Sequence, residues 1–457
     1  MSDHRSEERR RPRGAAKNGP GSGPKKGDAR RTALAVLQAV LDDGQPLDDA
    51  LARNPVLPKL AARDRGFARL LAATVLRRLG QTDALIDHCL DRPLKRKDTA
   101  LRHILRLGAV QLLFLGTPAH AAVSTSLDLA RGPRLAGQRG LLNAVLRRLA
   151  REGSDLVATQ DAARLNTPDW LWERWCTAYG ETTTRAIAAA QLAEPPLDLS
   201  CKADDGTTGA ETWAERLDAA VLPGGSLRLK GGQGDVARLP GYAEGAWWVQ
   251  DAAAAVPARL LGNIAGRTVL DLCAAPGGKT AQLAAAGAEV IAVERAANRL
   301  KRLEENLQRL GLGAATVATD AAAWQPPQPA DAVLLDAPCS ATGTLRRHPD
   351  IAWLKGPDQI AGLTEAQDRL LEAAAAMLKP GGLLVYAVCS LQPEEGPERI
   401  AALLEKTENL VRVPITAEEL PGMAEALTAE GDFRSLPCHL AAQGGLDGFY
   451  ACRLKRR

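Results

Sequence analysis

The sequence predicts a multidomain protein in which an all-α N-terminal bundle and a small mixed α/β segment precede a larger C-terminal α/β domain. Three observations lead to this prediction. The chain has 457 residues, which is too long for one ordinary core. Apolar residues recur at helical spacing from residue 30 to about residue 151. From about residue 249, short apolar runs alternate with helical segments, as in a doubly wound parallel sheet.

The composition is that of a globular protein, with 46% apolar and 25% charged residues. No apolar run approaches the ~18 residues of a membrane span and no signal peptide is recognisable, so we expect a cytoplasmic protein without a membrane partner. The eight cysteines form no Cys-x-x-Cys pair, and we therefore predict no metal site. In a reducing cytosol these thiols stay free for chemistry.

The first segment, residues 1–28, is rich in Gly, Pro, Lys and Arg, and we predict a disordered basic tail. Residues 1–31 contain ten Lys or Arg and four Asp or Glu, whereas the whole chain has a net charge of +4. The rest of the chain therefore carries a net charge of about −2. A polyanionic partner would thus be bound by the tail and by local basic patches.

Residues 29–155 form the predicted helical bundle. Leu34, Leu37 and Val40 line one face of a first helix, and Phe67 and Leu71 lie on the apolar face of another. Gly and Pro residues at 44–46 and 116–118 separate the helices.

Residues 160–248 are predicted to be a mixed α/β segment. Trp170, Trp172 and Trp175 lie on an expected helix, and a strand over residues 197–201 follows two prolines. The tryptophans could stack on nucleic-acid bases, but packing between helices is their more frequent role.

Residues 249–457 form the predicted α/β domain. Its expected strands cover residues 269–272, 290–293, 332–335 and 383–388. A capping box of Thr364 and Gln367 is expected to begin one helix, and residues 379–382 (KPGG) to end it.

A glycine-rich loop, DLCAAPGGKT at residues 271–280, follows the first of these strands and opens a helix. Glycines there let the backbone approach a ligand, and Lys279 could contact a carboxylate. The loop is neither a Gly-x-Gly-x-x-Gly nor a Walker motif. Glu294 ends the next strand and could accept from ribose hydroxyls, and Asp320 could accept from an adenine amino group.

Two further strands lead to cysteines. Cys339 lies three residues after Asp336, and Cys389 directly follows the run 383–388. Both strand ends should face the ligand crevice. A thiolate that adds to carbon 6 of cytosine makes carbon 5 nucleophilic enough to accept a methyl group, and Asp336 could hydrogen-bond the protonated ring nitrogen.

Several stretches carry a resemblance to a known family. The bundle is similar to the NusB-like RNA-binding domain in ARDR (62–65), ILRLG (104–108), PAHAAV (118–123) and LNAVLRR (142–148). The chain as a whole resembles the bacterial RNA 5-methylcytosine methyltransferases, with further matches at QD (250–251), TLRRHPD (344–350) and DGFYA (447–451). The resemblance implies a Rossmann-like class I methyltransferase domain and S-adenosylmethionine as cofactor.

The resemblance also implies site residues. Cys389 would be the nucleophile, Cys339 would assist product release, and Asp336 would contact the cytosine ring. In DNA 5-methylcytosine enzymes the cysteine after proline is instead the attacker. The implied cofactor-binding residues are Cys273, Ala274, Ala275, Pro276, Gly277, Gly278, Lys279, Glu294, Asp320 and Asp336. One departure is Val388, where the family usually has threonine.

The resemblance implies that the partner is RNA, namely 16S ribosomal RNA, and the expected state is a monomer that binds no DNA. A transfer RNA cytosine methyltransferase remains an alternative, since its catalytic set would be the same. A DNA enzyme fits less well because no target-recognition domain follows Cys339. A non-catalytic RNA-binding or assembly factor is the alternative of another class.

Overall fold

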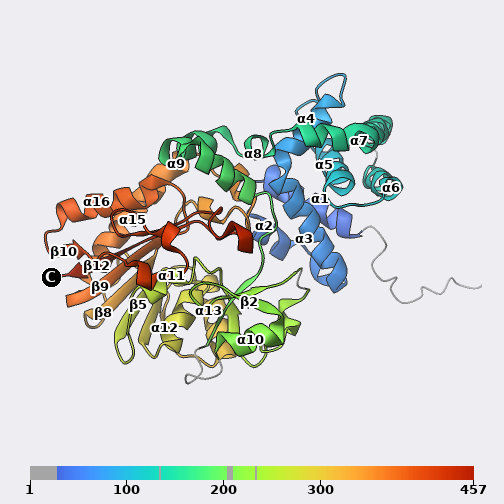
Figure 1. Cartoon of the computed structure of the whole chain (residues 1–457). Coiled ribbons are helices and arrows are strands. Elements are labelled where there is room, and N and C mark those ends of the chain that lie inside the picture. Colours follow the sequence, from blue (N-terminus) through green and yellow to red (C-terminus); the bar gives the residue numbers. More distant parts are fainter. Residues whose placement is uncertain (1–27, 133–134, 203–208, 232–233) are drawn as a thin grey trace, which may run out of the picture.

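The computed structural model describes residues 28–132, 135–202, 209–231 and 234–457, in three parts that lie against one another (Figure 1). The predicted tail lies outside the described residues, except for Asp28 at the start of the first helix. Among the described helices, none combines the length and apolar character needed to cross a membrane.

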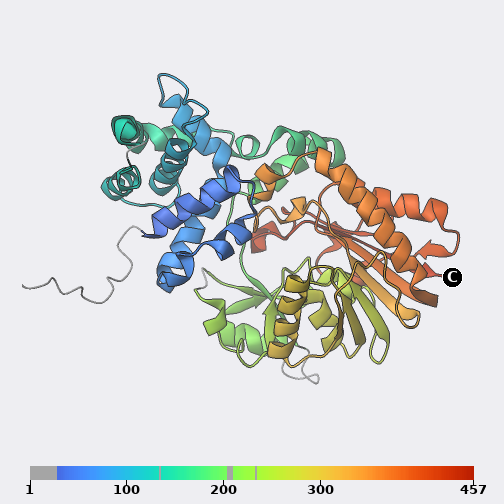
Figure 2. The same cartoon turned by 180° about the vertical axis from the view of Figure 1, so that it is seen from behind.

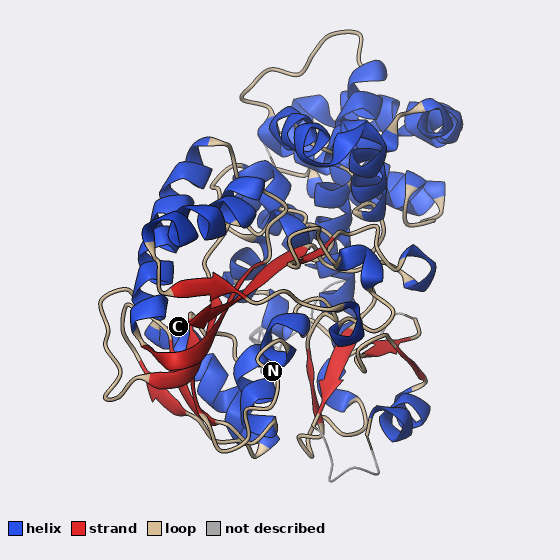
Figure 3. Ribbon diagram, turned by 60° about the vertical axis from the view of Figure 1, so that its left-hand side comes forward, coloured by secondary structure: helices blue, strands red, loops and turns tan. Residues whose placement is uncertain are grey.

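The N-terminal part is a bundle of helices, as predicted, and Figure 3 shows helices and loops there. Its helices are α1 (Asp28–Leu41), α2 (Leu47–Arg53), α3 (Ala62–Arg77), α4 (Leu79–His88), α5 (Thr99–Leu113), α6 (Ala119–Leu129) and α7 (Arg139–Thr159). Helix α5 is central and packs against α1, α3, α4, α6 and α7. Gly108 allows α7 to approach closely, because a Cβ there would lie 2.6 Å from Cδ2 of Leu146.

The middle part begins with α8 (Ala162–Leu165) and α9 (Asp169–Ala190). A four-stranded antiparallel sheet follows, in the order β2-β3-β1-β4. Its elements are β1 (Asp198–Cys201), α10 (Ala210–Leu217), β2 (Ala219–Val221), β3 (Leu227–Leu229) and β4 (Trp247–Val249). Helix α9 packs on the C-terminal part, where Trp175 is fully buried against Leu391 and Leu436. Trp175 therefore has the packing role that is usual for a helical tryptophan.

The C-terminal part is a doubly wound sheet in the order β10-β12-β9-β8-β5-β6-β7. Strands β5 to β9 pair in parallel, and β12 runs antiparallel between β9 and β10. The strands are β5 (Thr268–Leu272), β6 (Glu289–Val293), β7 (Ala315–Val317), β8 (Ala330–Asp336), β9 (Leu378–Val388), β10 (Leu410–Arg412) and β12 (Phe449–Arg456), and β11 (Phe433–Ser435) pairs with β12.

Helices cover both faces of this sheet, as the apolar strand runs predict. One face packs against α11 (Val256–Arg259), α12 (Gly278–Ala285) and α13 (Ala297–Leu310). The other packs against α15 (Asp358–Ala376) and α16 (Pro397–Lys406). Figure 2 shows α15 crossing this second face.

The predicted ends of helix α15 are wrong. The helix begins at Asp358, so Thr364 lies inside it and its hydroxyl donates to the Ala361 carbonyl. The Gln367 amide instead donates to the carbonyl of Pro338, a contact with a distant loop. Residues 379–382 belong to β9, and the helix ends earlier, at Ala376.

The segment after β8 joins the C-terminal part to the bundle. Asp350 accepts a hydrogen bond from the Leu47 amide, and the Trp353 indole donates to the Leu76 carbonyl. Arg77 of α3 donates to the carbonyl of Arg346 at 2.8 Å. These contacts, which join residues more than 260 positions apart, fix the bundle against the C-terminal part of the chain.

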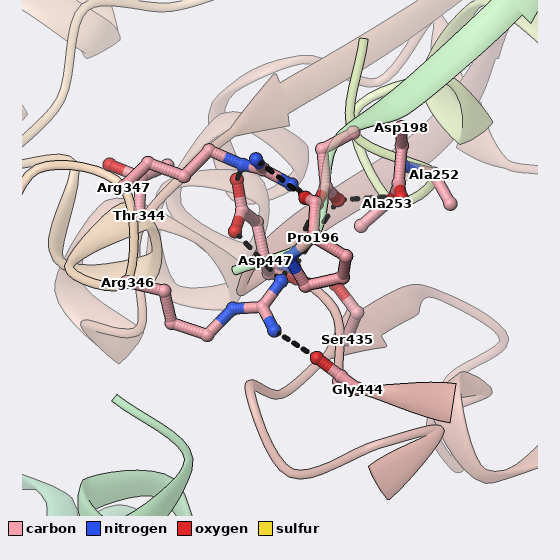
Figure 4. A network of polar contacts seen from close by, with 12 residues as sticks. Pro196, Asp198, Ala252, Ala253, Thr344, Arg346, Arg347, Ser435, Gly444 and Asp447 are labelled. Carbon is pink, nitrogen blue, oxygen red and sulfur yellow. Dashed lines mark hydrogen bonds and ion pairs between the residues drawn. The ribbon is translucent and has the colours of Figure 1, made fainter. Parts of the chain in front are cut away.

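A buried ionic network continues from this segment (Figure 4). Arg347 pairs with Asp251 at 2.6 Å and with Asp447 at 2.9 Å. Arg228 of β3 pairs with Asp198 of β1 at 2.6 Å. We call the set of Asp198, Arg228, Asp251, Arg346, Arg347 and Asp447 the junction network, because it joins the middle sheet to the C-terminal part.

Candidate active site

The glycine-rich loop connects β5 to α12 at the carboxyl end of the sheet. Gly277 has φ +98°, and a Cβ there would lie 2.9 Å from Cγ of Leu303. This glycine is therefore required by the backbone turn and by the approach of α13. Arg299 of α13 donates to the carbonyl of Ala275, and Asn306 donates to that of Pro276. Helix α13 thus holds the loop that the sequence predicts to bind the cofactor.

Asp271, at the end of β5, is fully buried beneath this loop. Its Oδ2 accepts a hydrogen bond of 2.6 Å from the Thr280 hydroxyl, whereas its Oδ1 has no partner. Burial raises the pKa of Asp271 to about 7, and repulsion from Asp336 adds to this, while the Thr280 bond opposes it. The sequence indicated this residue as part of the motif but not its raised pKa.

Glu294 and Asp320 follow neighbouring strands at the same edge of the sheet. Glu294 is buried, and its Oε1 accepts from the Ala296 amide. Its Oε2 lies 3.3 Å from Arg299 but has no hydrogen-bond partner. Asp320 is exposed, three residues beyond β7, and accepts from the Ala322 amide. A buried acceptor without a hydrogen-bond partner, as at Glu294, could hold a ribose hydroxyl, whereas Asp320 offers an exposed acceptor.

Lys279 connects the loop to the end of β8. Its ammonium donates to Oδ2 of Asp336 at 2.7 Å and lies 5.1 Å from the centre of the Phe449 ring. Burial alone would lower the pKa of Lys279, but attraction to Asp336 and Cys389 outweighs burial, and the pKa is raised. This pairing with Asp336, and the position of Phe449, were not foreseen from the sequence.

The two cysteines lie in contact. Asp336 is paired with Ala387 across β8 and β9, so the two strands end side by side. The Sγ atoms of Cys339 and Cys389 are 3.4 Å apart, and both residues are half-buried. The hydrogen bond with Cys389, burial, and repulsion from Cys389 and Glu395 together raise the pKa of the Cys339 thiol.

Val388 precedes Cys389 and faces the sheet core rather than the crevice. Its side chain is fully buried in the cluster that includes Leu335 and Tyr386. The departure from threonine therefore lies in the apolar core of the sheet.

Glu395 is a functional candidate that sequence reasoning missed. It is fully buried behind both cysteines, where it accepts hydrogen bonds from Ser340 and Ser390. A serine directly after each cysteine was the signal in the sequence, but nothing in the sequence indicated that one carboxylate reaches both.

Comparisons with known proteins agree on the family. The model of the 16S rRNA methyltransferase RsmB/F family matches residues 258–455, and that of the NusB family matches residues 27–151. Ribosomal RNA small subunit methyltransferase B of Vibrio cholerae is 39% identical, over 83% of this chain and 90% of its own. The protein of the same name from Pseudomonas putida is 38% identical, over 93% and 98%.

Solved structures show the same fold. The crystal structure of PH0851 has a TM-score of 0.72 at 24% identity, over 95% of this chain and 99% of its own. NSun6 from Pyrococcus horikoshii with SFG has a TM-score of 0.52 at 20% identity, over 63% and 98%. Given the identity to the curated relatives over most of both chains, this protein belongs to the RsmB/F family of 16S rRNA methyltransferases, which are S-adenosylmethionine-dependent enzymes, and it carries a NusB domain at its N-terminus.

Proposed function

We propose that the protein methylates carbon 5 of a cytosine in 16S ribosomal RNA through a covalent bond between Cys389 and carbon 6. The observation that carries this proposal is the contact of 3.4 Å between the two thiols, beside Asp336 and Lys279 at the carboxyl edge of the sheet. Carbon 5 of cytosine is a poor nucleophile. Addition of a thiolate at carbon 6 replaces one difficult step by two easier ones.

The cofactor site comprises the loop of residues 273–279 with Glu294, Asp320 and Asp336. Glu294 would accept from the ribose hydroxyls through the oxygen that has no partner in the protein. When bound, S-adenosylmethionine supplies an electrophilic methyl group. Because the loop and the cysteines lie at the same edge of the sheet, the methyl donor and the cytosine can meet there.

The attack needs a thiolate at Cys389 and a stabilised ring. Asp336 would accept a hydrogen bond from the protonated ring nitrogen, and Lys279 holds the Asp336 carboxylate in place. Cys339 lies close enough to donate its proton in a hydrogen bond to the Cys389 sulfur. The same contact would assist release. When a base removes the proton from carbon 5, the carbon 6–sulfur bond breaks, and the leaving thiolate accepts a hydrogen bond from Cys339.

A denaturing gel tests this mechanism. Cys389→Ala should abolish methyl transfer and leave no protein–RNA adduct. Cys339→Ala should still attack and transfer the methyl, and then accumulate the adduct because release is slowed. Cys438→Ala, at a cysteine between β11 and β12, is the control and should behave as the unmodified protein. The reversed gel pattern would assign the attack to Cys339, and activity without an adduct in both variants would remove the covalent step.

RNA recognition is assigned to the segments outside the catalytic domain. We propose that the bundle of residues 29–155 and the segment 160–248 hold RNA, with the basic tail adding affinity, and that the protein acts as a cytoplasmic monomer. Deleting residues 1–28 should flatten the salt dependence of RNA binding by about 0.7 in log–log slope for each phosphate that the tail neutralises. An unchanged slope would show that the tail does not contribute to RNA binding.

Bisulfite sequencing of total RNA from a deletion strain would identify the methylated cytosine. Loss of the methylation signal in transfer RNA alone would overturn the assignment to ribosomal RNA.

A further inference from the structure

Glu395 ends the short 3-10 helix Pro393–Glu395 that follows β9, and its carboxylate is 0% exposed. Its Oε1 accepts from the Ser340 amide at 2.8 Å and from the Gln367 amide group at 3.2 Å. Its Oε2 accepts from the hydroxyls of Ser340 and Ser390, each at 2.5 Å. These four donors are neutral, so the carboxylate brings a negative charge into the protein interior.

The two serines directly follow the two cysteines. One carboxylate therefore holds the residue after Cys339 and the residue after Cys389 at the same time. Thr342 reinforces this arrangement, because its hydroxyl lies 3.3 Å from that of each serine. The loops are also joined through the backbone, since the Gly343 amide donates to the Cys389 carbonyl at 3.0 Å. The distance between the thiols is thus set by contacts behind them, away from the crevice.

Different charged groups act on the two thiols. The hydrogen bond with Cys389, burial, and repulsion from Cys389 and Glu395 raise the pKa of Cys339. Lys279, in contrast, is attracted to Cys389. A negative charge near one thiol and a positive charge near the other favour a proton on the first and a thiolate at the second. The titratable and charged groups that face the pair are Glu395, Tyr386, Lys279 and Asp336.

We propose that Glu395 is a positioning residue that holds Cys339 and Cys389 in contact and whose charge favours the protonated form of Cys339. The proposal rests on the proposed function for its meaning, but the state of the thiols can be measured without RNA or methyl transfer. A failure of the covalent mechanism and a failure of this inference are therefore distinguishable.

Alkylation of the full-length protein by iodoacetamide tests the charge. A thiolate forms a sulfur–carbon bond and releases iodide, and peptide mass spectrometry gives the rate at each cysteine from about pH 6 to about pH 10, where thiols titrate. The unmodified protein should react faster at Cys389. In Glu395→Gln, which keeps the size and removes the charge, this preference should fall by roughly tenfold or more. Glu398→Gln makes the same change at an exposed site of α16 and should leave the preference unchanged.

A second variant tests whether the hydrogen bonds of Glu395 to Ser340 and Ser390 hold the two cysteines in contact. It remains informative if Glu395→Gln fails to fold. Ser390→Ala removes one donor and leaves the charge. Diamide takes two electrons and two protons from the thiols and yields a Cys339–Cys389 disulfide. This reaction should slow by roughly tenfold in Ser390→Ala, since the effective concentration of one sulfur at the other falls. An unchanged disulfide rate in Ser390→Ala, or an unchanged alkylation preference in folded Glu395→Gln, would overturn the inference.

Discussion

Two groups of buried carboxylates differ in whether their oxygens are satisfied within the protein. In the junction network, Oδ1 of Asp251 accepts from the amides of Ala253 and Asp447, and its Oδ2 accepts from Arg347. At the crevice, Oδ1 of Asp271 and Oε2 of Glu294 are equally buried but have no hydrogen-bond partner.

The difference distinguishes the carboxylates of the junction network from those of the crevice. A buried polar group is normally paired, and an unpaired one in a native protein needs an explanation. Every carboxylate oxygen of the junction network accepts from a protein group, and the network holds the middle sheet against the C-terminal part. The crevice carboxylates leave acceptors available, as a site that must bind a ligand requires. Each substitution below is chosen to break or sharpen this distinction.

The largest effect is expected from opening the junction network. Asp251→Ala should lower the free energy of unfolding by about 3–5 kcal/mol, because it removes one of the two carboxylates that the buried Arg346 and the half-buried Arg347 share. Urea denaturation measures this change. Asp128→Ala, which breaks an exposed pair with Arg131, is the control and should cost at most about 1 kcal/mol. Equal losses in both variants would contradict a structural role of the junction network.

The pH dependence of stability should report Asp271. Its pKa of about 7 in the folded protein lies above the ordinary value of 3.8, so the folded state favours the protonated form. This contribution is fully present below about pH 4 and is lost as the pH rises through about 7. Asp271→Asn should therefore gain stability relative to the unmodified protein between these limits, by up to about 4 kcal/mol. A difference in unfolding free energy that does not vary with pH would show that Asp271 is ionised.

Loss of the free acceptor at the crevice should affect binding rather than folding. Glu294→Ala should weaken S-adenosylmethionine binding by about 1.5–3 kcal/mol, because the ribose hydroxyls lose a charged acceptor. Calorimetry measures the affinity, and RNA binding should be nearly unchanged. Glu289→Ala, at the exposed start of the same strand, is the matched control. Unaltered cofactor affinity in Glu294→Ala would remove this residue from the ribose site.

A smaller change tests geometry rather than charge. Arg347→Lys retains a cation but loses the fork that reaches Asp251 and Asp447 together, so stability should fall by about 1 kcal/mol. Thermal unfolding measures the decrease, and Arg53→Lys at an exposed pair should leave the midpoint unchanged. If Arg347→Lys also leaves the midpoint of thermal unfolding unchanged, the positive charge at this position suffices and the forked guanidinium is not required.

The strands were predictable from the sequence because they are buried on both faces and read as unbroken apolar runs. The ends of α15 were not. Thr364 and Gln367 have the residue types of a cap, but Gln367 is used in a contact with Pro338, and Pro357 precedes the true start. Local propensity carried no information about that distant loop, so tertiary packing overrode it.

The candidate site, like helix α15, was predictable from the sequence only in part. Residues at strand ends, such as Glu294 and Cys389, were predictable because parallel strands end at one edge of a sheet. The pairing of Lys279 with Asp336 and the reach of Glu395 to both serines depend on loops from separate strands. Only the folded arrangement of those loops reveals such contacts.

The position of β12 bears on how the enzyme is made. This strand lies between β9 and β10 in the sheet but follows both in the sequence. During synthesis the bundle, whose contacts are local, can fold early, whereas the outer edge of β9 stays unpaired until β12 has left the ribosome. Because β9 leads directly to Cys389, a nascent chain carries a finished helical domain well before it has a complete catalytic sheet. The catalytic sheet is therefore completed only when the strand that lies in its interior, β12, has been synthesised.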